Sequence, residues 1–326
     1  MLRFVAPRRV EIQRAEVDFP EAGEVLIRTQ WSGISGGTEL LAYRGELDET
    51  LELDETLGAL AGRFRYPFAY GYSCVGEVEA SRTEGIEEGT TVFAFHPHQD
   101  RFTVGGADVV RIEGVDARVA TLFPLVETAL QVSLDAGPRL EEPVVVLGLG
   151  TIGMLTAALL QRSGADVVGV DPRRDRREAA TVFGVPGVDT SQIRDAVASS
   201  TSGAGVPLVV DATGNPSALA GALELLAHEG EVLVCSWYGA KEVPLPLGRA
   251  FHRRRLAIRS TQVSTIPGRL RRHWDVPRRR RAAARLMTEL PLKLLATHEL
   301  PFERAADAYA ALDRGEEGVL HVALRY

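Results

Sequence analysis

The chain is poor in cysteine, has no long apolar run and has no excess of positive charge, and each shortage excludes a class of protein. Only two cysteines, Cys74 and Cys235, occur in 326 residues, which excludes a disulfide scaffold and a zinc site with four thiolate ligands. No apolar stretch has the length of a membrane span, and residues 1–9 are too charged for a signal peptide, so we expect a cytoplasmic protein without a membrane partner. The formal net charge of −7 disfavours nucleic acid as a partner.

Arginine is nevertheless concentrated in three short runs, residues 253–255, 271–272 and 278–281. The last run opens a segment with helical apolar spacing. We interpret it as the solvated face of an amphipathic helix, and a role near cofactor phosphates or an acidic substrate is the alternative.

The most informative feature present is a glycine motif that follows an apolar run. Residues 144–153 read Val-Val-Val-Leu-Gly-Leu-Gly-Thr-Ile-Gly. The continuous apolar run is typical of a buried parallel strand, and Gly148 lets the chain turn tightly out of it. Gly150 keeps side chains away from a pyrophosphate, and Gly153 lets the next helix pack closely on the sheet, with its N-terminal N–H groups directed at phosphates. The motif predicts a dinucleotide site.

An acid at the end of the next strand indicates which dinucleotide binds. A second apolar run, residues 167–170, ends at Asp171, where a carboxylate accepts hydrogen bonds from the adenosine ribose and repels a 2′-phosphate. We therefore favour NAD, with NADP as the alternative because Arg173 follows closely. Two later runs end near Thr213 and at Ser236-Trp237, where Trp237 or Tyr238 either walls the nicotinamide or an aromatic substrate or packs under a loop. The predicted cofactor residues are Gly148, Gly150, Thr151, Ile152, Gly153, Asp171, Arg173, Thr213, Ser236 and Trp237.

The chain is expected to form two domains of an α/β protein. Residues 1–118 show short alternating runs broken by glycine and proline, typical of antiparallel β structure, with surface turns at 67–72 and 85–90. Residues 119–290 alternate strands with helices, including a helix at 217–228, and predict a doubly wound parallel sheet. The tail, 291–326, is expected to complete the N-terminal domain.

This layout resembles the medium-chain dehydrogenase/reductase superfamily, in which a GroES-like β-rich catalytic domain is interrupted by a Rossmann domain that binds NAD(P). The resemblance covers nearly the whole chain and rests on residues 32–39, 71–78, 144–153, 211–215 and 300–318. The Ser-Gly-Ile-Ser form within residues 32–39 is similar to the branch that contains hydroxyethyl-bacteriochlorophyllide dehydrogenase. The resemblance implies an oxidoreductase with a small-molecule substrate, and a homodimer paired through the last Rossmann strand near 256–262.

The sequence departs from zinc alcohol dehydrogenases of that superfamily at the metal ligands. The positions of their cysteine, histidine and acidic ligands align here with Ser35, Tyr72, Ser73 and Phe123, and residues 93–101 stand where a structural zinc loop would lie. None of these four side chains is the thiolate or imidazole that zinc prefers. We therefore predict no zinc and no other metal, and expect hydroxyls, an imidazole or a carboxylate to polarise the substrate carbonyl instead.

Three hydroxyl side chains are candidates for that role. The resemblance places Thr38 where the superfamily hydrogen-bonds the substrate oxygen, and helix capping is the alternative. Tyr72 would project into the vacated metal position, either as a hydrogen-bond donor or as a core filler. Ser35 stands at the former cysteine position.

Two ionisable residues are further candidates. The resemblance places Glu127 beside the nicotinamide, as a base or a holder of a substrate hydroxyl or amine, and the alternative is an acid favoured in the first turn of a helix. His98 is a candidate general acid because its pKa lies near neutrality. His96 and His98 would share a face on a strand and could bind a metal with Asp100, or His98 is an ordinary loop residue.

The leading prediction is thus a zinc-independent NAD(P)-dependent oxidoreductase that interconverts an alcohol and a carbonyl by hydride transfer. Reduction of an activated C=C bond, as in quinone and enoyl reductases, is the alternative, because conjugation spreads the developing charge without a metal. A non-catalytic NAD(P) sensor or scaffold is the alternative outside enzymes.

Overall fold

The computed structural model describes all residues, 1–326, and divides the chain into two compact units. One unit comprises Met1–Pro124 with Arg280–Tyr326, and the other comprises Leu125–Arg279. The sequence places the boundaries at 118/119 and 290/291, whereas the structure has them inside two helices, α3 (Phe123–Ala136) and α8 (Val276–Glu289). A helix that runs through a boundary has no break in periodicity to mark it. None of the helices has the length and apolar composition that a membrane span requires.

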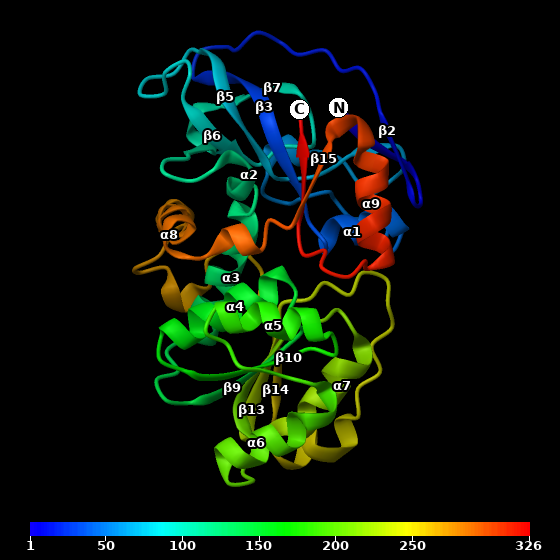
Figure 1. Ribbon diagram of the computed structural model, residues 1–326, viewed down its shortest axis with the longest axis vertical. Coiled ribbons are helices and arrows are strands. Elements are labelled where there is room, and N and C mark those ends of the chain that lie inside the picture. Colours follow the sequence, from blue (N-terminus) through cyan, green and yellow to red (C-terminus); the bar gives the residue numbers. More distant parts are fainter. The chain divides into compact units, whose positions relative to one another are not determined.

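The Leu125–Arg279 unit is built on a six-stranded parallel sheet in the order β11-β10-β9-β12-β13-β14. In Figure 1, α4 and α5 lie on one face of this sheet and α6 and α7 on the other. The direction of strand addition reverses between β9 and β12, which is where doubly wound folds bind their ligands. The predicted doubly wound sheet is confirmed. Its elements are β9 (Pro143–Leu147), α4 (Thr151–Arg162), β10 (Asp166–Val170), α5 (Arg174–Val182), β11 (Gly187–Val188), η3 (Thr190–Gln192), α6 (Ile193–Thr201), β12 (Val206–Asp211), α7 (Pro216–Leu225), β13 (Leu226–Val234), η4 (Leu247–Phe251), β14 (Ala257–Ser260) and η5 (Gly268–Leu270).

The central strands carry the apolar core of this unit. Val145 and Val209 are at most 1% exposed and pack with Leu223 of α7. Full burial of such a side chain contributes about 1.5–3 kcal/mol to folding. The predicted helix 217–228 is too long, because α7 ends at Leu225 and Leu226 already pairs with Val206 in the sheet. Both leucines at this junction are buried, so the apolar pattern shows no break there.

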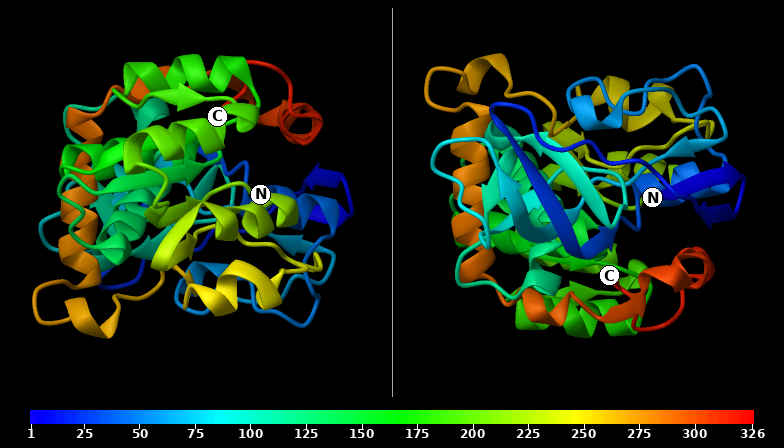
Figure 2. Two further views of the ribbon diagram at one scale, coloured as in Figure 1. Left: turned by 90° about the horizontal axis from the view of Figure 1, so that it is seen from below. Right: turned by 90° about the horizontal axis from the view of Figure 1, so that it is seen from above.

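The other unit is rich in β structure. Its larger sheet has the order β15-β16-β3-β5-β6-β8, with β7 also paired to β3, and a smaller sheet has the order β2-β1-β4. All pairs are antiparallel, as predicted, except β15 with β16. Figures 1 and 2 show β3 beside β5 and β7. The elements are β1 (Leu2–Ala6), β2 (Arg9–Ile12), β3 (Glu24–Ile34), α1 (Thr38–Arg44), η1 (Gly58–Leu60), β4 (Phe68–Ala69), β5 (Cys74–Ser81), β6 (Thr91–Ala94), β7 (Arg101–Gly105), η2 (Gly106–Asp108), β8 (Val109–Arg111), α2 (Ala117–Ala120), η6 (Leu292–Leu294), β15 (His298–Pro301), η7 (Phe302–Arg304), α9 (Ala305–Arg314) and β16 (Val322–Arg325).

The C-terminal strand β16 pairs antiparallel with β3, so the tail belongs to the N-terminal sheet. Residues 67–72 are not the predicted surface turn, because Phe68 and Tyr70 are 6% and 3% exposed and β4 pairs with β1. The Phe68 and Tyr70 rings pack against Phe4. Burial of these aromatic rings outweighs the turn preference of the flanking proline and glycine.

Candidate active site

The glycine motif forms a turn that only glycine permits at two positions. Gly148 has φ +87°, and a Cβ there would lie 2.8 Å from the carbonyl oxygen of Ala212. A Cβ on Gly153 would lie 1.8 Å from the carbonyl oxygen of Gly148, so the first turn of α4 packs directly on the turn. Gly150 is the N-cap of α4 and provides no side-chain cap, which leaves the backbone of this helix terminus to face a ligand.

The other predicted cofactor residues gather at the same edge of the sheet. Strands β10, β9, β12 and β13 end in register, with Val170, Leu147, Asp211 and Val234 as neighbours. The segments that follow these four strand ends contain the glycine turn, Asp171, Thr213 and Ser236-Trp237. The structure therefore brings this predicted set together within one unit.

Asp171 braces the glycine turn. Its side chain is buried at 6% exposure, and it accepts hydrogen bonds from the N–H groups of Leu149 at 2.8 Å and of Arg173 at 2.9 Å. The Arg173 guanidinium is paired with Asp175, with one N–O distance of 2.7 Å. Arg173 thus contributes a backbone N–H to this site, while its side chain is engaged elsewhere.

Arg176 is a residue that the sequence did not single out. Its Nη1 lies 3.0 Å from the position of a Cβ on Gly150, and its Nε is buried without a hydrogen-bond partner. Burial lowers the pKa of Arg176, and the Asp171 carboxylate opposes that shift. A buried donor beside a glycine cradle is the arrangement that a phosphate-bearing ligand completes, so these residues fit a dinucleotide. No signal in the sequence distinguishes Arg176 from the neighbouring Arg174 and Arg177.

The strand ends of β12 and β13 are held by Asp211, which is fully buried. The Tyr238 hydroxyl donates to its Oδ2 at 2.6 Å, and the Thr213 hydroxyl donates to its Oδ1 at 2.6 Å. Burial and the Asp211 carboxylate raise the pKa of Tyr238. Because the Tyr238 ring also packs against the core, packing explains this residue, whereas Trp237 is 42% exposed at the strand end.

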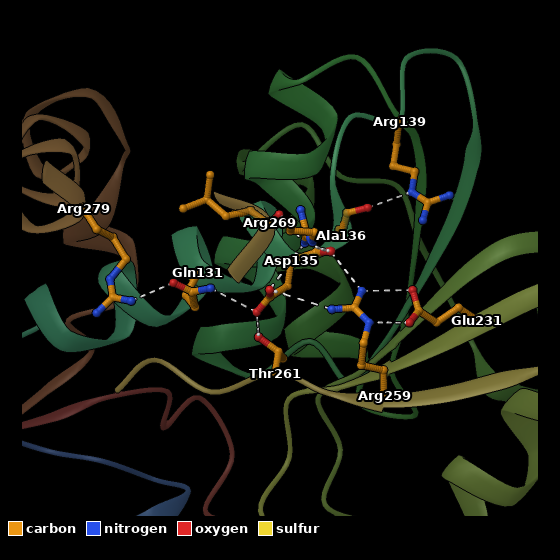
Figure 3. A network of polar contacts seen from close by, with 10 residues as sticks. Gln131, Asp135, Ala136, Arg139, Glu231, Arg259, Thr261, Arg269 and Arg279 are labelled. Carbon is orange, nitrogen blue, oxygen red and sulfur yellow. Dashed lines mark hydrogen bonds and ion pairs between the residues drawn. The ribbon is translucent and has the colours of Figure 1, made fainter. Parts of the chain in front are cut away.

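Glu127 lies in a buried polar network along α3, part of which is drawn in Figure 3. Glu127 and Arg279 are each 2% exposed, and the Arg279 Nε donates to Glu127 at 3.0 Å. Arg279 also donates to Gln131 at 2.6 Å, and Gln131 donates to Asp135 at 3.0 Å. A neighbouring guanidinium stabilises the carboxylate as an anion and so disfavours proton acceptance.

The same network divides the arginine run at 278–281 into exposed and buried side chains. Arg278 and Arg281 are exposed, as the solvated-face interpretation predicts. That interpretation is wrong for Arg279, whose side chain is buried against Glu127. The geometry favours a structural role for the Glu127–Arg279 pair.

A cluster of hydroxyl groups occupies the predicted site in the other unit. The side-chain hydroxyls of Ser35 and Thr38 lie near the Tyr72 phenol and favour its ionised form. The capping interpretation of Thr38 is wrong, because the N-cap of α1 is Gly37 and no side chain caps this helix. Burial and the charge of Glu39 raise the pKa of Tyr72, so the phenol keeps its proton. Ser35, Thr38 and Tyr72 are called the hydroxyl cluster below.

The residues at the former ligand positions do not fit zinc. Ser73 donates its hydroxyl to the carbonyl oxygen of Thr121 at 2.7 Å. Phe123 packs against Phe93 with ring centroids 4.6 Å apart. With the hydroxyls of Ser35 and Tyr72, this set has no thiolate, imidazole or carboxylate donor, which are the ligands that zinc takes in proteins.

His98 lies in the loop between β6 and β7, as the loop interpretation predicts, but its side chain has two buried polar partners. Its side chain is fully buried, with Nδ1 2.7 Å from the Ser32 hydroxyl and Nε2 2.9 Å from Glu39. β6 ends at Ala94, so His96 and His98 do not lie on a strand, and His96 instead stacks on Phe102 with ring centroids 3.8 Å apart. Burial lowers the pKa of His96 to about 4. The two imidazoles have different partners and do not form a ligand pair.

Comparison with known proteins relates the chain to dehydrogenases. Residues 151–276 match the family model described as zinc-binding dehydrogenase, a stretch that contains none of Ser35, Tyr72, Ser73 and Phe123. The chain is 26% identical to 2-desacetyl-2-hydroxyethyl bacteriochlorophyllide A dehydrogenase of Cereibacter sphaeroides, over 93% of this chain and 91% of that protein.

Two further similarities extend over the same length. The chain is 24% identical to L-galactonate-5-dehydrogenase of Escherichia coli, over 93% of this chain and 92% of that protein. The structure of 2R,3R-butanediol dehydrogenase from Bacillus subtilis superposes with a TM-score of 0.78 at 21% identity, over 100% of this chain and 99% of that one. At that identity the superposition shows the shared fold.

Proposed function

Because the chain belongs to the medium-chain dehydrogenase/reductase superfamily, we propose that it interconverts an alcohol and a carbonyl by hydride transfer without zinc. The observation that carries the proposal is the hydroxyl cluster. By the resemblance, Ser35 and Tyr72 align with metal ligands of zinc-dependent members and Thr38 aligns with the residue that hydrogen-bonds the substrate oxygen. The cluster therefore offers hydrogen-bond donors in place of a Lewis acid.

The bound nicotinamide supplies or accepts the hydride. Tyr72 donates a hydrogen bond to the substrate oxygen, where negative charge develops as a carbonyl is reduced. Its raised pKa keeps it a donor rather than a base at neutral pH. Thr38 and Ser35 lie beside the phenol, where their hydroxyls can orient it. One oriented donor of this kind is worth about 10²–10³ in rate.

Reduction of an activated C=C bond is the competing reaction, because an enone spreads charge and needs no metal. A panel of aldehydes, ketones and enones, each with NADH and NADPH, separates the reactions. We expect turnover of aldehydes or ketones, and of the corresponding alcohols with the oxidised cofactor. Turnover of enones alone would contradict the alcohol–carbonyl reaction, and tight cofactor binding without turnover of any substrate would favour a sensor.

We propose NAD as the preferred cofactor, supported by the Asp171 carboxylate at the end of β10. Arg176 beside Gly150 would contact the phosphate side of either cofactor. Replacing Asp171 by alanine should weaken NADH binding by about tenfold or more and weaken NADPH binding less. Equal losses for both cofactors would contradict the preference.

We also propose a homodimer. β14 is an edge strand of the six-stranded sheet, and its unpaired side can pair with a second copy. A monomer mass in light scattering at micromolar concentration would contradict this.

A further inference from the structure

Glu39 is a fully buried carboxylate that the proposed reaction does not use directly. It lies in α1 next to Thr38, and its side chain is 0% exposed. Burying a carboxylate costs free energy unless hydrogen bonds and charges compensate for the lost water. The partners of Glu39 therefore indicate its role. Those partners come from segments far apart in the sequence.

Three donors converge on this carboxylate. The backbone N–H of Ser35 donates to Oε1 at 2.9 Å. The Tyr309 hydroxyl donates to Oε2, and His98 Nε2 lies 2.9 Å from the same oxygen. Because Oε2 accepts from both, the arrangement assigns the proton of neutral His98 to Nε2.

The hydrogen bonds on the other side of His98 also donate toward Glu39. With its proton on Nε2, His98 accepts at Nδ1 from the Ser32 hydroxyl at 2.7 Å, and Ser32 accepts from the Tyr326 hydroxyl at 3.0 Å. Every donor in this chain then has an acceptor, and the negative charge rests on Glu39. Gly71 makes room for the His98 ring, because a Cβ at that position would lie 2.5 Å from it.

We propose that Glu39 is the positioning residue of the hydroxyl cluster: its bond to the Ser35 N–H fixes the turn that carries Ser35 and Thr38. His98 and Tyr309 keep the Glu39 charge in place. The inference rests on the proposed function of the cluster, but the coupling between Glu39 and Tyr72 can be measured without turnover.

The charges around Tyr72 and Glu39 favour this assignment. Tyr72 faces two acidic groups, Glu39 and Asp54, and both raise its pKa. The Glu39 charge raises the pKa of four tyrosines and one cysteine, each of which is neutral when protonated: Tyr70, Tyr72, Cys74, Tyr309 and Tyr326. His98 is the imidazole bonded to Glu39, and its Nε2 donates to the carboxylate.

The test is an NMR titration of Tyr72 in the full-length protein. 3,5-Difluorotyrosine at position 72 lowers the phenol pKa into the measurable range, and its ¹⁹F shift reports ionisation directly. Replacing Glu39 by glutamine should lower that pKa by about one unit, because one buried charge at short range is worth about that much. Glu39→Asp, which keeps the charge, should restore most of the shift.

Asp313→Asn is the matched control. Asp313 is a carboxylate of the same unit, bonded to Arg44 and Arg8 rather than to the cluster, and its loss should leave the ¹⁹F titration unchanged. If Glu39→Gln does not fold, Tyr309→Phe removes one donor from the same carboxylate and should still shift the titration. An unchanged titration in a folded Glu39→Gln or Tyr309→Phe protein would overturn the inference.

Kinetics separates this inference from the proposed function. In protein that carries 3,5-difluorotyrosine at position 72, we expect Glu39→Gln to move the alkaline fall of kcat/KM about one pH unit lower, with the Kd for NADH unchanged. If Tyr72→Phe has wild-type activity while Glu39→Gln still shifts the ¹⁹F titration, the reaction assignment fails and the positioning role of Glu39 stands. If Tyr72→Phe is inactive and the titration does not shift, the reverse holds.

Discussion

The two units build their sites from different parts of the chain. The cofactor site in Leu125–Arg279 depends on backbone: two glycines that tolerate no Cβ, a helix terminus and strand ends in register. The hydroxyl cluster in the other unit depends on side chains held by a buried carboxylate. A backbone site is specified locally by residue type and spacing, whereas a side-chain site needs tertiary contacts to assemble it.

The difference also bears on tolerance to change. A backbone site fails when a single atom is added, because the main chain has nowhere to move. A side-chain site is altered when one hydroxyl group or one charge is removed, while the fold stays intact. Each prediction below acts on one of these properties.

The largest effect is expected from the ion pair in the cofactor unit. Replacing Arg279 by methionine leaves Glu127 buried without its counter-charge, which should lower the free energy of unfolding by about 3–5 kcal/mol in urea denaturation. Replacing both residues by methionine should recover much of that loss. A Glu127→Gln protein that is fully stable but has no turnover would contradict the structural role and return Glu127 to catalysis.

The next effect tests how strictly the backbone site excludes side chains. Alanine at Gly153 puts a Cβ 1.8 Å from the Gly148 carbonyl oxygen, so the turn must move. We expect NADH affinity, measured by fluorescence titration, to fall about 100-fold, the equivalent of about 3 kcal/mol. Gly221→Ala in α7 is the control, because a Cβ there meets nothing within 4 Å and should leave affinity unchanged. Normal NADH binding by Gly153→Ala would contradict the claim that the backbone site excludes a side chain at this position.

A smaller effect concerns a buried histidine of the β-rich unit. Burial lowers the pKa of His321 to about 4 from the ordinary value of 6.5, so the unfolded chain binds its proton at a higher pH than the folded one. The stability contributed by neutral His321 is therefore complete above pH 6.5 and is lost as the pH falls toward 4. Between pH 7 and pH 5 the loss is about 2 kcal/mol.

Urea denaturation at both pH values measures this loss. His321→Gln should reduce the pH dependence by that amount, since glutamine can still donate to Thr121 but does not titrate. Exposed His252→Gln is the control. An unchanged pH dependence in His321→Gln would show that other groups cause it.

The contrast between the units also explains what the sequence could predict. The glycine motif and Asp171 lie within one short segment, the later strand ends follow from the regular alternation of strands and helices, and the structure brings them together as expected. Arg176 was missed because an arginine run gives no hint of which guanidinium turns inward. Glu127 was linked to the nicotinamide by the resemblance alone, since its partner Arg279 is remote in the sequence.

The hydroxyl cluster was predicted only from the positions of its residues in the alignment with the superfamily. The resemblance brought Ser35, Thr38 and Tyr72 to one place, but the sequence could not show that the two aliphatic hydroxyls lie beside the phenol. The role of Glu39 was invisible because its partners lie in three other segments, at residues 32–35, 98 and 309. No local pattern records such an assembly, and a buried Glu beside a Thr looks like an ordinary helix start.

The central claim is that Tyr72, and not zinc, acts on the substrate oxygen. The most direct measurement is kcat/KM of chelator-treated enzyme and of its Tyr72→Phe variant, each with and without added zinc, alongside the Kd for NADH. We predict that chelation and zinc leave the wild-type value unchanged, and that Tyr72→Phe lowers it by about 10²–10³ with NADH binding intact. Activity lost on chelation, restored by zinc and unaffected by Tyr72→Phe would contradict the claim.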